Sequence, residues 1–213
     1  MSTACRIHRP HIAAAILAAS FAAACGSTNF VKAPPSYSGA PLDVVYVYSF
    51  IDVRTKDIGD TYVSAFNREL EQQLARRGVR ARLLKFEDSP VARDTSLASS
   101  DPVGLYRSTS VQVPVGAVIR ANQSEERAFG ATRRLIVFPA DLSRGGNIGL
   151  YTRWDVAEPG GKVIWTSTSR TNQTFGASHL TAGNAANCVS EVLAQMERLG
   201  ILAAAAPSSA GKT

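Results

Sequence analysis

The sequence predicts a single small α/β domain, in which helices pack mainly on one face of a mixed sheet. Three observations support this prediction. Residues 42–51 and 79–86 are short apolar segments of strand type, the segment between them has the periodicity of an amphipathic helix, and residues 148–168 alternate as a hairpin does. Such helices bury their apolar stripes against a sheet, so residues 42–200 are expected to form the folded domain.

The opening of the domain is expected to be strand, helix, strand. Residues 42–51 are β-branched and aromatic and contain neither glycine nor proline, which is typical of a buried strand. In the helix that follows, Asp60 is the expected N-cap and Gly78 the residue that ends it. Its apolar residues recur at helical spacing: Val63, Phe66, Leu70 and Leu74. Residues 79–86 then form the second expected strand.

The middle of the chain is less regular. Residues 87–113 are interrupted throughout by Asp, Ser, Thr and Pro, and they predict a long polar segment without a regular element. A helix is expected over 114–128, with Pro114 in its first turn. Another buried strand, 135–138, is expected to end at Pro139.

A hairpin is the clearest feature of the second half. Its arms are residues 148–156 and 162–168, and residues 158–161 supply the turn. Trp154 and Trp165 lie on these arms, where core packing or cross-strand pairing is the common role of a large aromatic side chain.

The last helix is expected over 182–199, with Thr181 as its N-cap and Gly200 as its C-terminal stop. Cys188 falls within its apolar stripe and is therefore expected to be a small buried hydrophobe. Residues 201–213 are expected to be a disordered tail.

The N-terminal residues 1–24 have the features of a signal peptide. Arg6 and Arg9 precede an apolar run from Ile12 to Ala24, and no acidic residue occurs before Asp43. A helix that spans a bilayer needs about 20 apolar residues, and this run is shorter. A basic leader, a short apolar core and small residues together predict export from the cytoplasm.

Two interpretations of the cleavage site are open. Ala22–Ala24 fit ordinary signal cleavage, in which case Cys25 merely follows the site. The same residues followed by Cys25 also resemble the lipobox of bacterial lipoproteins, although Ala22 stands where Leu is usual. In that family the cysteine becomes the first mature residue and carries fatty-acyl groups such as palmitate. We favour lipidation of Cys25, because several acyl chains give the stable anchoring that one chain cannot.

Residues 25–41 are expected to be a lipidated N-terminus followed by a linker. They are rich in Gly, Ser, Pro and Ala and lack the period of a helix or a strand. By analogy with enterobacterial sorting, Gly26 in place of Asp after the cysteine implies an outer-membrane lipoprotein that faces the periplasm.

Charge and cysteine content exclude some classes. Loss of Arg6 and Arg9 with the leader lowers the formal net charge from +6 to +4, and the remaining basic residues are dispersed. Nucleic-acid binders concentrate such residues on one face, so no nucleic-acid partner is expected. With Cys5 in the leader and Cys25 acylated, Cys188 is left without a disulfide partner.

The layout resembles a small α/β domain found in several envelope proteins. Three segments carry the resemblance: Val45–Phe50, Phe129–Val137 and Trp154–Trp165. Over roughly residues 42–200 this order of elements is similar to the N-terminal domain of TolB, to CsgG-like secretion lipoproteins and to LpoB-type activators of penicillin-binding proteins. The resemblance implies a fold of this kind and a non-enzymatic envelope role, although a shared layout does not establish a shared function.

The sequence offers little material for catalysis. His179 is the only histidine after the leader, and no motif surrounds it, so neither a catalytic triad nor a zinc site is expected. We expect no cofactor, since the Gly211–Thr213 end lacks the rest of a phosphate-binding loop. Two pairs of carboxylates could in principle lie in a cleft, although base rates favour surface charges: Glu125 with Glu126, and Asp155 with Glu158.

These observations predict a membrane-anchored, periplasm-facing lipoprotein that is a non-enzymatic scaffold or accessory subunit in envelope transport or assembly. An envelope protein partner is expected, and residues 87–113 are the candidate contact segment, because loops on rigid scaffolds often bind. The oligomeric state is left open. The alternatives are an envelope hydrolase that acts on glycan and a carrier of an apolar ligand.

Overall fold

The structure is a computed structural model that describes residues 26–94, 115–144, 147–173 and 179–203. The strands are β1 (Gly26–Phe30), β2 (Val44–Ser49), β3 (Arg80–Lys85), β4 (Arg133–Arg144), β5 (Ile148–Ala157) and β6 (Val163–Gln173). The helices are α1 (Thr55–Ile58), α2 (Asp60–Arg76), α3 (Pro90–Asp94), α4 (Val115–Phe129) and α5 (Ala182–Arg198), with short 3-10 turns η1 (Ile51–Arg54) and η2 (Phe86–Asp88).

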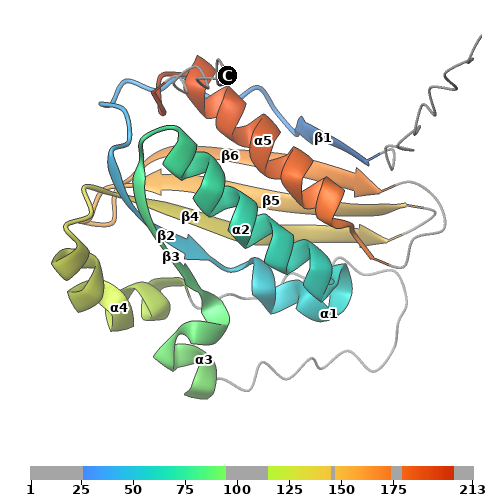
Figure 1. Ribbon diagram of the computed structural model, residues 1–213, viewed down its shortest axis with the longest axis horizontal. Coiled ribbons are helices and arrows are strands. Elements are labelled where there is room, and N and C mark those ends of the chain that lie inside the picture. The colour runs from blue at the N-terminus through green and yellow to red at the C-terminus, as the bar shows by residue number, and fades with distance from the viewer. Residues whose placement is uncertain (1–25, 95–114, 145–146, 174–178, 204–213) are drawn as a thin grey trace, which may run out of the picture.

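The six strands form one mixed sheet in the order β1-β6-β5-β4-β2-β3 (Figure 1). Strand β2 pairs in parallel with both β3 and β4, whereas β4, β5, β6 and β1 are antiparallel neighbours. The predicted fold class, a single α/β domain with helices on a mixed sheet, is confirmed.

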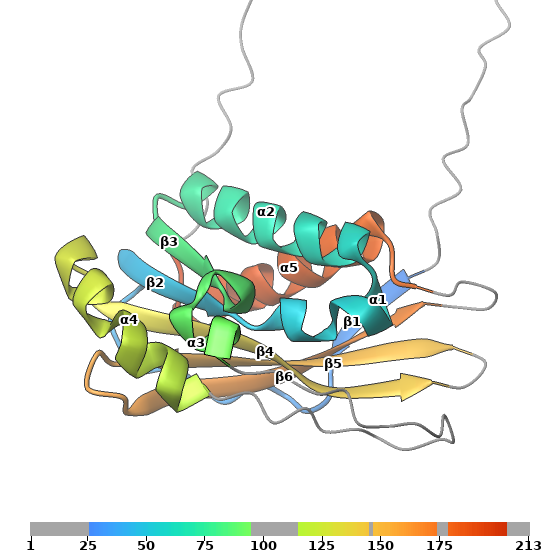
Figure 2. The ribbon, with the colours of Figure 1, turned by 90° about the horizontal axis from the view of Figure 1, so that it is seen from below.

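Helices α2 and α5 cover one face of this sheet, and α4 packs on part of the other (Figure 2). Successive residues of a strand point to opposite faces. Val45 and Val47 therefore join the core under α2 and α5, while Tyr46 and Tyr48 join a smaller cluster with Val118 of α4. The expectation of helices mainly on one face holds for α2 and α5, the two longest helices that the structure describes, whereas α4 lies on the other face.

Large side chains occupy the space between the sheet and helices α2 and α5. Trp154 is fully buried, with its ring centroid 5.5 Å from that of Phe66, and its indole N–H donates to the Ser169 hydroxyl at 3.0 Å. Trp165 is also buried and donates to the carbonyl of Pro35. Both tryptophans thus have the structural role that the sequence predicted.

Helices α2 and α5 run in the same direction. At their C-terminal ends the Arg77 guanidinium contacts the Glu197 carboxylate at 2.7 Å, and at the other end Leu180, just before α5, donates its N–H to the carbonyl of Ile58, just before α2. We call the end at which α2 and α5 both start the α1 end. It comprises α1, the starts of α2, α5, β1 and β5, and the last residues of β4 and β6, and it lies opposite the turn between β5 and β6.

The helix ends are partly as predicted. Gly78 has a φ of 72° and follows α2, with the Val79 N–H bonded to the Leu74 carbonyl, so the predicted stop is confirmed. Thr181 is the N-cap of α5 and forms a reciprocal capping box with Asn184. The assignment of Asp60 as N-cap was wrong.

Gly59 occupies the N-cap position of α2, and no side-chain hydrogen bond caps this helix. Asp60 is instead the first helical residue. The tight passage from α1 into α2 gives Gly59 a φ of 91°, a backbone conformation that an aspartate rarely adopts. Asp60 still complements the positive end of the helix dipole.

Strand β4 does not end at Pro139, and this expectation was wrong. It continues to Arg144, with an irregularity in its pairing to β5 between Pro139 and Asp141. Strand β2 pairs with β4 only as far as Val137. Beyond that point β4 has one strand neighbour, so a proline lacking an N–H costs the sheet little.

The residues expected to form a linker begin instead with a strand. Gly26–Phe30 is β1, and it pairs along its whole length with the end of β6, which extends to Gln173 rather than to residue 168. The predicted helix over 114–128 is present as α4, one residue displaced. Within 87–113 the described residues include η2 and α3, and residues 95–113 lie outside the described ranges.

Candidate functional site

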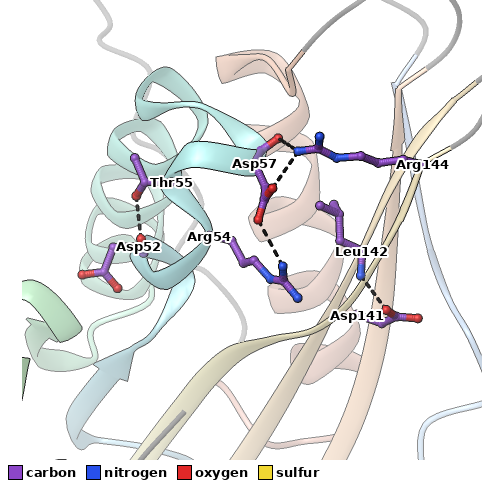
Figure 3. A network of polar contacts seen from close by, with 7 residues as sticks. All are labelled: Asp52, Arg54, Thr55, Asp57, Asp141, Leu142 and Arg144. Atoms are coloured by element: carbon purple, nitrogen blue, oxygen red, sulfur yellow. Dashed lines mark hydrogen bonds and ion pairs between the residues drawn. The ribbon is translucent and has the colours of Figure 1, made fainter. Parts of the chain in front are cut away.

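The α1 end is held together by polar contacts that involve Asp57 (Figure 3). Arg144, the last residue of β4, contacts the Asp57 carboxylate at 2.8 Å and also donates to its backbone carbonyl at 3.1 Å. Arg54 reaches the other carboxylate oxygen of Asp57 at 3.1 Å. One aspartate therefore links η1, α1 and the end of β4.

The two arginines of this network differ in burial. The Arg54 side chain is only 5% exposed, whereas that of Arg144 is 57% exposed. A buried cation depends on its partner much more than an exposed one does, because water does not replace the lost contact. The Arg54–Asp57 contact is thus expected to stabilise α1 more than the exposed Arg144–Asp57 contact does.

A shallow hollow lies beside this network. Its lining residues are Thr55, Lys56, Gly59, Asp60, Thr61, His179 and Leu180. His179 is exposed, and its side chain lies against Gly59, where an added Cβ would approach the His179 Cβ to 3.2 Å. The close approach, together with the positive φ, explains the glycine. The same close approach means that the His179 side chain packs between the end of α1 and the start of α5.

Cys188 is fully buried, as the sequence predicted. Its sulfur lies 3.8 Å from the Ser169 hydroxyl, and burial raises the pKa of the thiol. A nucleophilic cysteine needs a lowered pKa and access to solvent. Cys188 is therefore an inert component of the core.

The first candidate pair of carboxylates is divided between two contacts. Glu126 is buried, accepts a hydrogen bond from the Tyr48 hydroxyl at 2.9 Å, and pairs with Arg134 at 2.7 Å. Its neighbour Glu125 points elsewhere and pairs with Arg82 at 2.5 Å near the surface. Burial and the Glu126 carboxylate raise the pKa of Tyr48. This cluster joins α4 to the sheet.

In the second pair, the Asp155 carboxylate is engaged in structural contacts. Asp155 is buried and accepts from the Thr166 hydroxyl at 2.5 Å and from the Arg153 guanidinium at 2.9 Å. Glu158 lies in the turn between β5 and β6, where its backbone closes the turn with Lys162. Within the described ranges, no group of three or more His, Cys, Asp or Glu side chains could hold a metal ion.

The lipidation site predicted at Cys25 lies outside the described residues. Its neighbour Gly26 is the first residue of β1 and lies opposite Gln173 of β6, at the α1 end. The sequence did not predict this pairing, because Gly26–Phe30 is largely polar and lacks strand periodicity. Of the helices in the described part of the chain, none has the length and apolar character needed to cross a bilayer.

The fold and this site define a single-domain α/β protein whose sheet begins directly after the predicted anchor cysteine. No family model matches the sequence, and no curated protein matches it. In structure the chain is similar to PelC from Paraburkholderia phytofirmans, which is described as a dodecamer. The TM-score is 0.43 at 15% identity, over 79% of this chain and 94% of that one.

The chain is also similar to lipoprotein GNA1162 from Neisseria meningitidis. The TM-score is 0.37 at 13% identity, over 73% of this chain and 96% of that one. These values are too low to assign a family or a role to this chain.

Proposed function

We propose that this protein is a lipoprotein of the bacterial envelope, anchored through acylated Cys25. The observation that carries the proposal is the run Ala22–Ala24 directly before Cys25, behind an apolar core and a basic leader. An acyl-diacylglycerol cysteine supplies the multiple chains that stable anchoring requires. Gly26 after the cysteine supports an outer-membrane location facing the periplasm.

We further propose that the domain acts without catalysis, as a scaffold or accessory subunit of an envelope machine. Three buried residues among those that the structure describes support this role. Cys188 is buried, and Glu126 and Asp155 are buried and each neutralised by an arginine. Acid–base and nucleophilic catalysis need such groups to be accessible and free to exchange protons.

The test is to express the full-length chain in a Gram-negative host with an alkyne-tagged palmitate. Wild-type protein is expected to incorporate the label and fractionate with the outer membrane. Cys25→Ser is expected to lose both, while Cys188→Ser keeps both and serves as the matched control. Label retained by Cys25→Ser, or unlabelled wild-type protein in the soluble fraction, would contradict the proposed anchor.

The scaffold role needs a second measurement. Crosslinking in intact cells, followed by purification from the membrane fraction and mass spectrometry, is expected to recover one recurrent envelope protein with the wild type. Cys25→Ser should recover much less of it. Glycan-hydrolase activity of the purified protein, abolished by a substitution at Asp155 that leaves the fold intact, would support the hydrolase alternative instead.

A further inference from the structure

We propose that the α1 end of the domain faces the lipid bilayer directly, and that the turn between β5 and β6 is directed away from it. This inference rests on the proposed anchor at Cys25 and adds the orientation of the domain to it. Its basis is the position at which the ordered sheet begins.

Strand β1 is tied firmly into the sheet. All five of its residues pair with β6, from Gly26 opposite Gln173 to Phe30 opposite Ser169. The Thr28 and Thr171 hydroxyls lie 3.2 Å apart, and the Val31 N–H continues the pairing to the Thr168 carbonyl at 3.0 Å. The Phe30 side chain packs against the core. The chain is therefore fixed from the residue directly after Cys25.

This pairing changes the length of the tether. A 17-residue linker over 25–41 could hold the domain as far as roughly 55 Å from its anchor when extended. With Gly26 fixed in the sheet, only one peptide unit of about 3.8 Å separates the Cα atoms of Cys25 and Gly26. The acylated residue and the first residue of the sheet are then neighbours, so the domain cannot move far from the bilayer.

The direction of β1 determines which end is held. Strand β1 starts where β6 ends, because the two are antiparallel. The same end carries α1 and the starts of α2 and α5 (Figures 1 and 2). At about 3.3 Å per residue, the 11 residues of β6 place the turn before Val163 about 35 Å from this end.

Charge at the α1 end does not by itself select anionic lipid. Exposed Lys56 and Arg144 are balanced by Asp57, which pairs with Arg144, and by exposed Asp60. Strong attraction to anionic lipid requires a cluster of basic residues. The acyl chains at Cys25 therefore supply the attachment, and the pairing of β1 with β6 supplies the orientation.

The test uses the full, acylated protein in vesicles of phosphatidylethanolamine and phosphatidylglycerol that contain lipids with a nitroxide on the headgroup. Bimane is placed by Lys56→Cys in one variant and by Lys162→Cys in the other. Both lysines are exposed, they lie at opposite ends, and buried Cys188 should not take the label. Quenching is expected to remove most of the fluorescence at position 56 and little of it at position 162.

Equal quenching at the two positions, or stronger quenching at position 162, would overturn the orientation while leaving the anchor intact. If mass spectrometry of the purified protein shows no acyl groups, the proposed anchor is overturned, and the orientation with it. A further variant carries a 12-residue Gly-Ser insertion between Cys25 and Gly26. It should remain membrane-bound and lose most of the quenching at position 56; unchanged quenching would show that tether length does not set the orientation.

Discussion

The Nε of Arg134 lies 2.7 Å from the Oε1 of Glu126, and the two side chains are only 5% and 3% exposed. The pair lies between β4 and α4, and the Tyr48 hydroxyl from β2 donates to the other carboxylate oxygen. Its position makes it the principal polar contact between α4 and the sheet.

Arg134→Met is expected to destabilise the domain by about 3 kcal/mol, because it leaves the Glu126 charge buried without its partner. Urea unfolding followed by circular dichroism measures this loss. The double variant Arg134→Met with Glu126→Leu should recover much of it, since replacing both members by apolar groups removes the uncompensated charge. A double variant less stable than Arg134→Met would show that the unpaired Glu126 charge is not the cause of the lost stability.

At the α1 end, Asp57→Ala should cost more than Arg144→Ala. Loss of Asp57 deprives buried Arg54 of a carboxylate, and we expect about 2 kcal/mol. Arg144 is largely exposed, and its contact is expected to be worth at most about 1 kcal/mol. Thermal or urea unfolding of both variants makes the comparison. The reverse order would contradict a substantial contribution of the Arg54–Asp57 contact.

Asp52 is expected to make stability pH-dependent. Burial raises the pKa of its carboxyl from 3.8 to about 6, partly offset by a hydrogen bond from the Glu87 N–H. A raised pKa means that the folded state holds the proton more tightly. Below about pH 4, Asp52 is protonated in both the folded and the unfolded state and does not lower the free energy of unfolding. Its destabilising effect grows as the pH rises to about 6 and is constant at higher pH.

Asp52→Asn keeps an acceptor for Glu87 and removes this titration. We expect the variant to be about 2 kcal/mol more stable than wild type at pH 7. The difference should be much smaller at pH 4. Urea unfolding at pH 4, 5, 6 and 7 tests the sign; a gain that is the same at every pH would contradict it.

Thr181→Ala should destabilise α5 by about 1 kcal/mol, because the Thr181 hydroxyl accepts from the Asn184 N–H in the capping box. Thr181→Ser is the matched control and should stay within a few tenths of a kcal/mol of wild type. Hydrogen exchange at the first turn of α5 should accelerate in the alanine variant only. Equal exchange in both variants would exclude a capping contribution.

The predictable part of the fold was the part with local signals. The β2–α2–β3 opening, α4, the β5–β6 hairpin and α5 were expected from hydrophobic periodicity and from stops such as Gly78. The burial of Cys188 and both tryptophans followed from their places in apolar stripes. Each of these signals lies within one helix, strand or hairpin, so it can be recognised from the sequence alone.

The missed features depend on neighbours that are distant in sequence. Strand β1 forms because the edge of β6 is available to pair with it, and Pro139 is tolerated because β2 has already ended beside it. The isolation of Glu126 from Glu125 likewise depends on Arg134 and Tyr48, which come from two strands. None of these partners can be recognised from the local sequence.

The sequence by itself predicts the export signal, the candidate anchor at Cys25 and the α/β class. It can do so because leader composition and side-chain periodicity are local properties. Only the tertiary structure decided that Gly26 lies in the sheet opposite Gln173 and that α2 and α5 start at that same end. The physical reason is that an edge strand gains its hydrogen bonds from a partner far along the chain. No local preference of five polar residues encodes that partner.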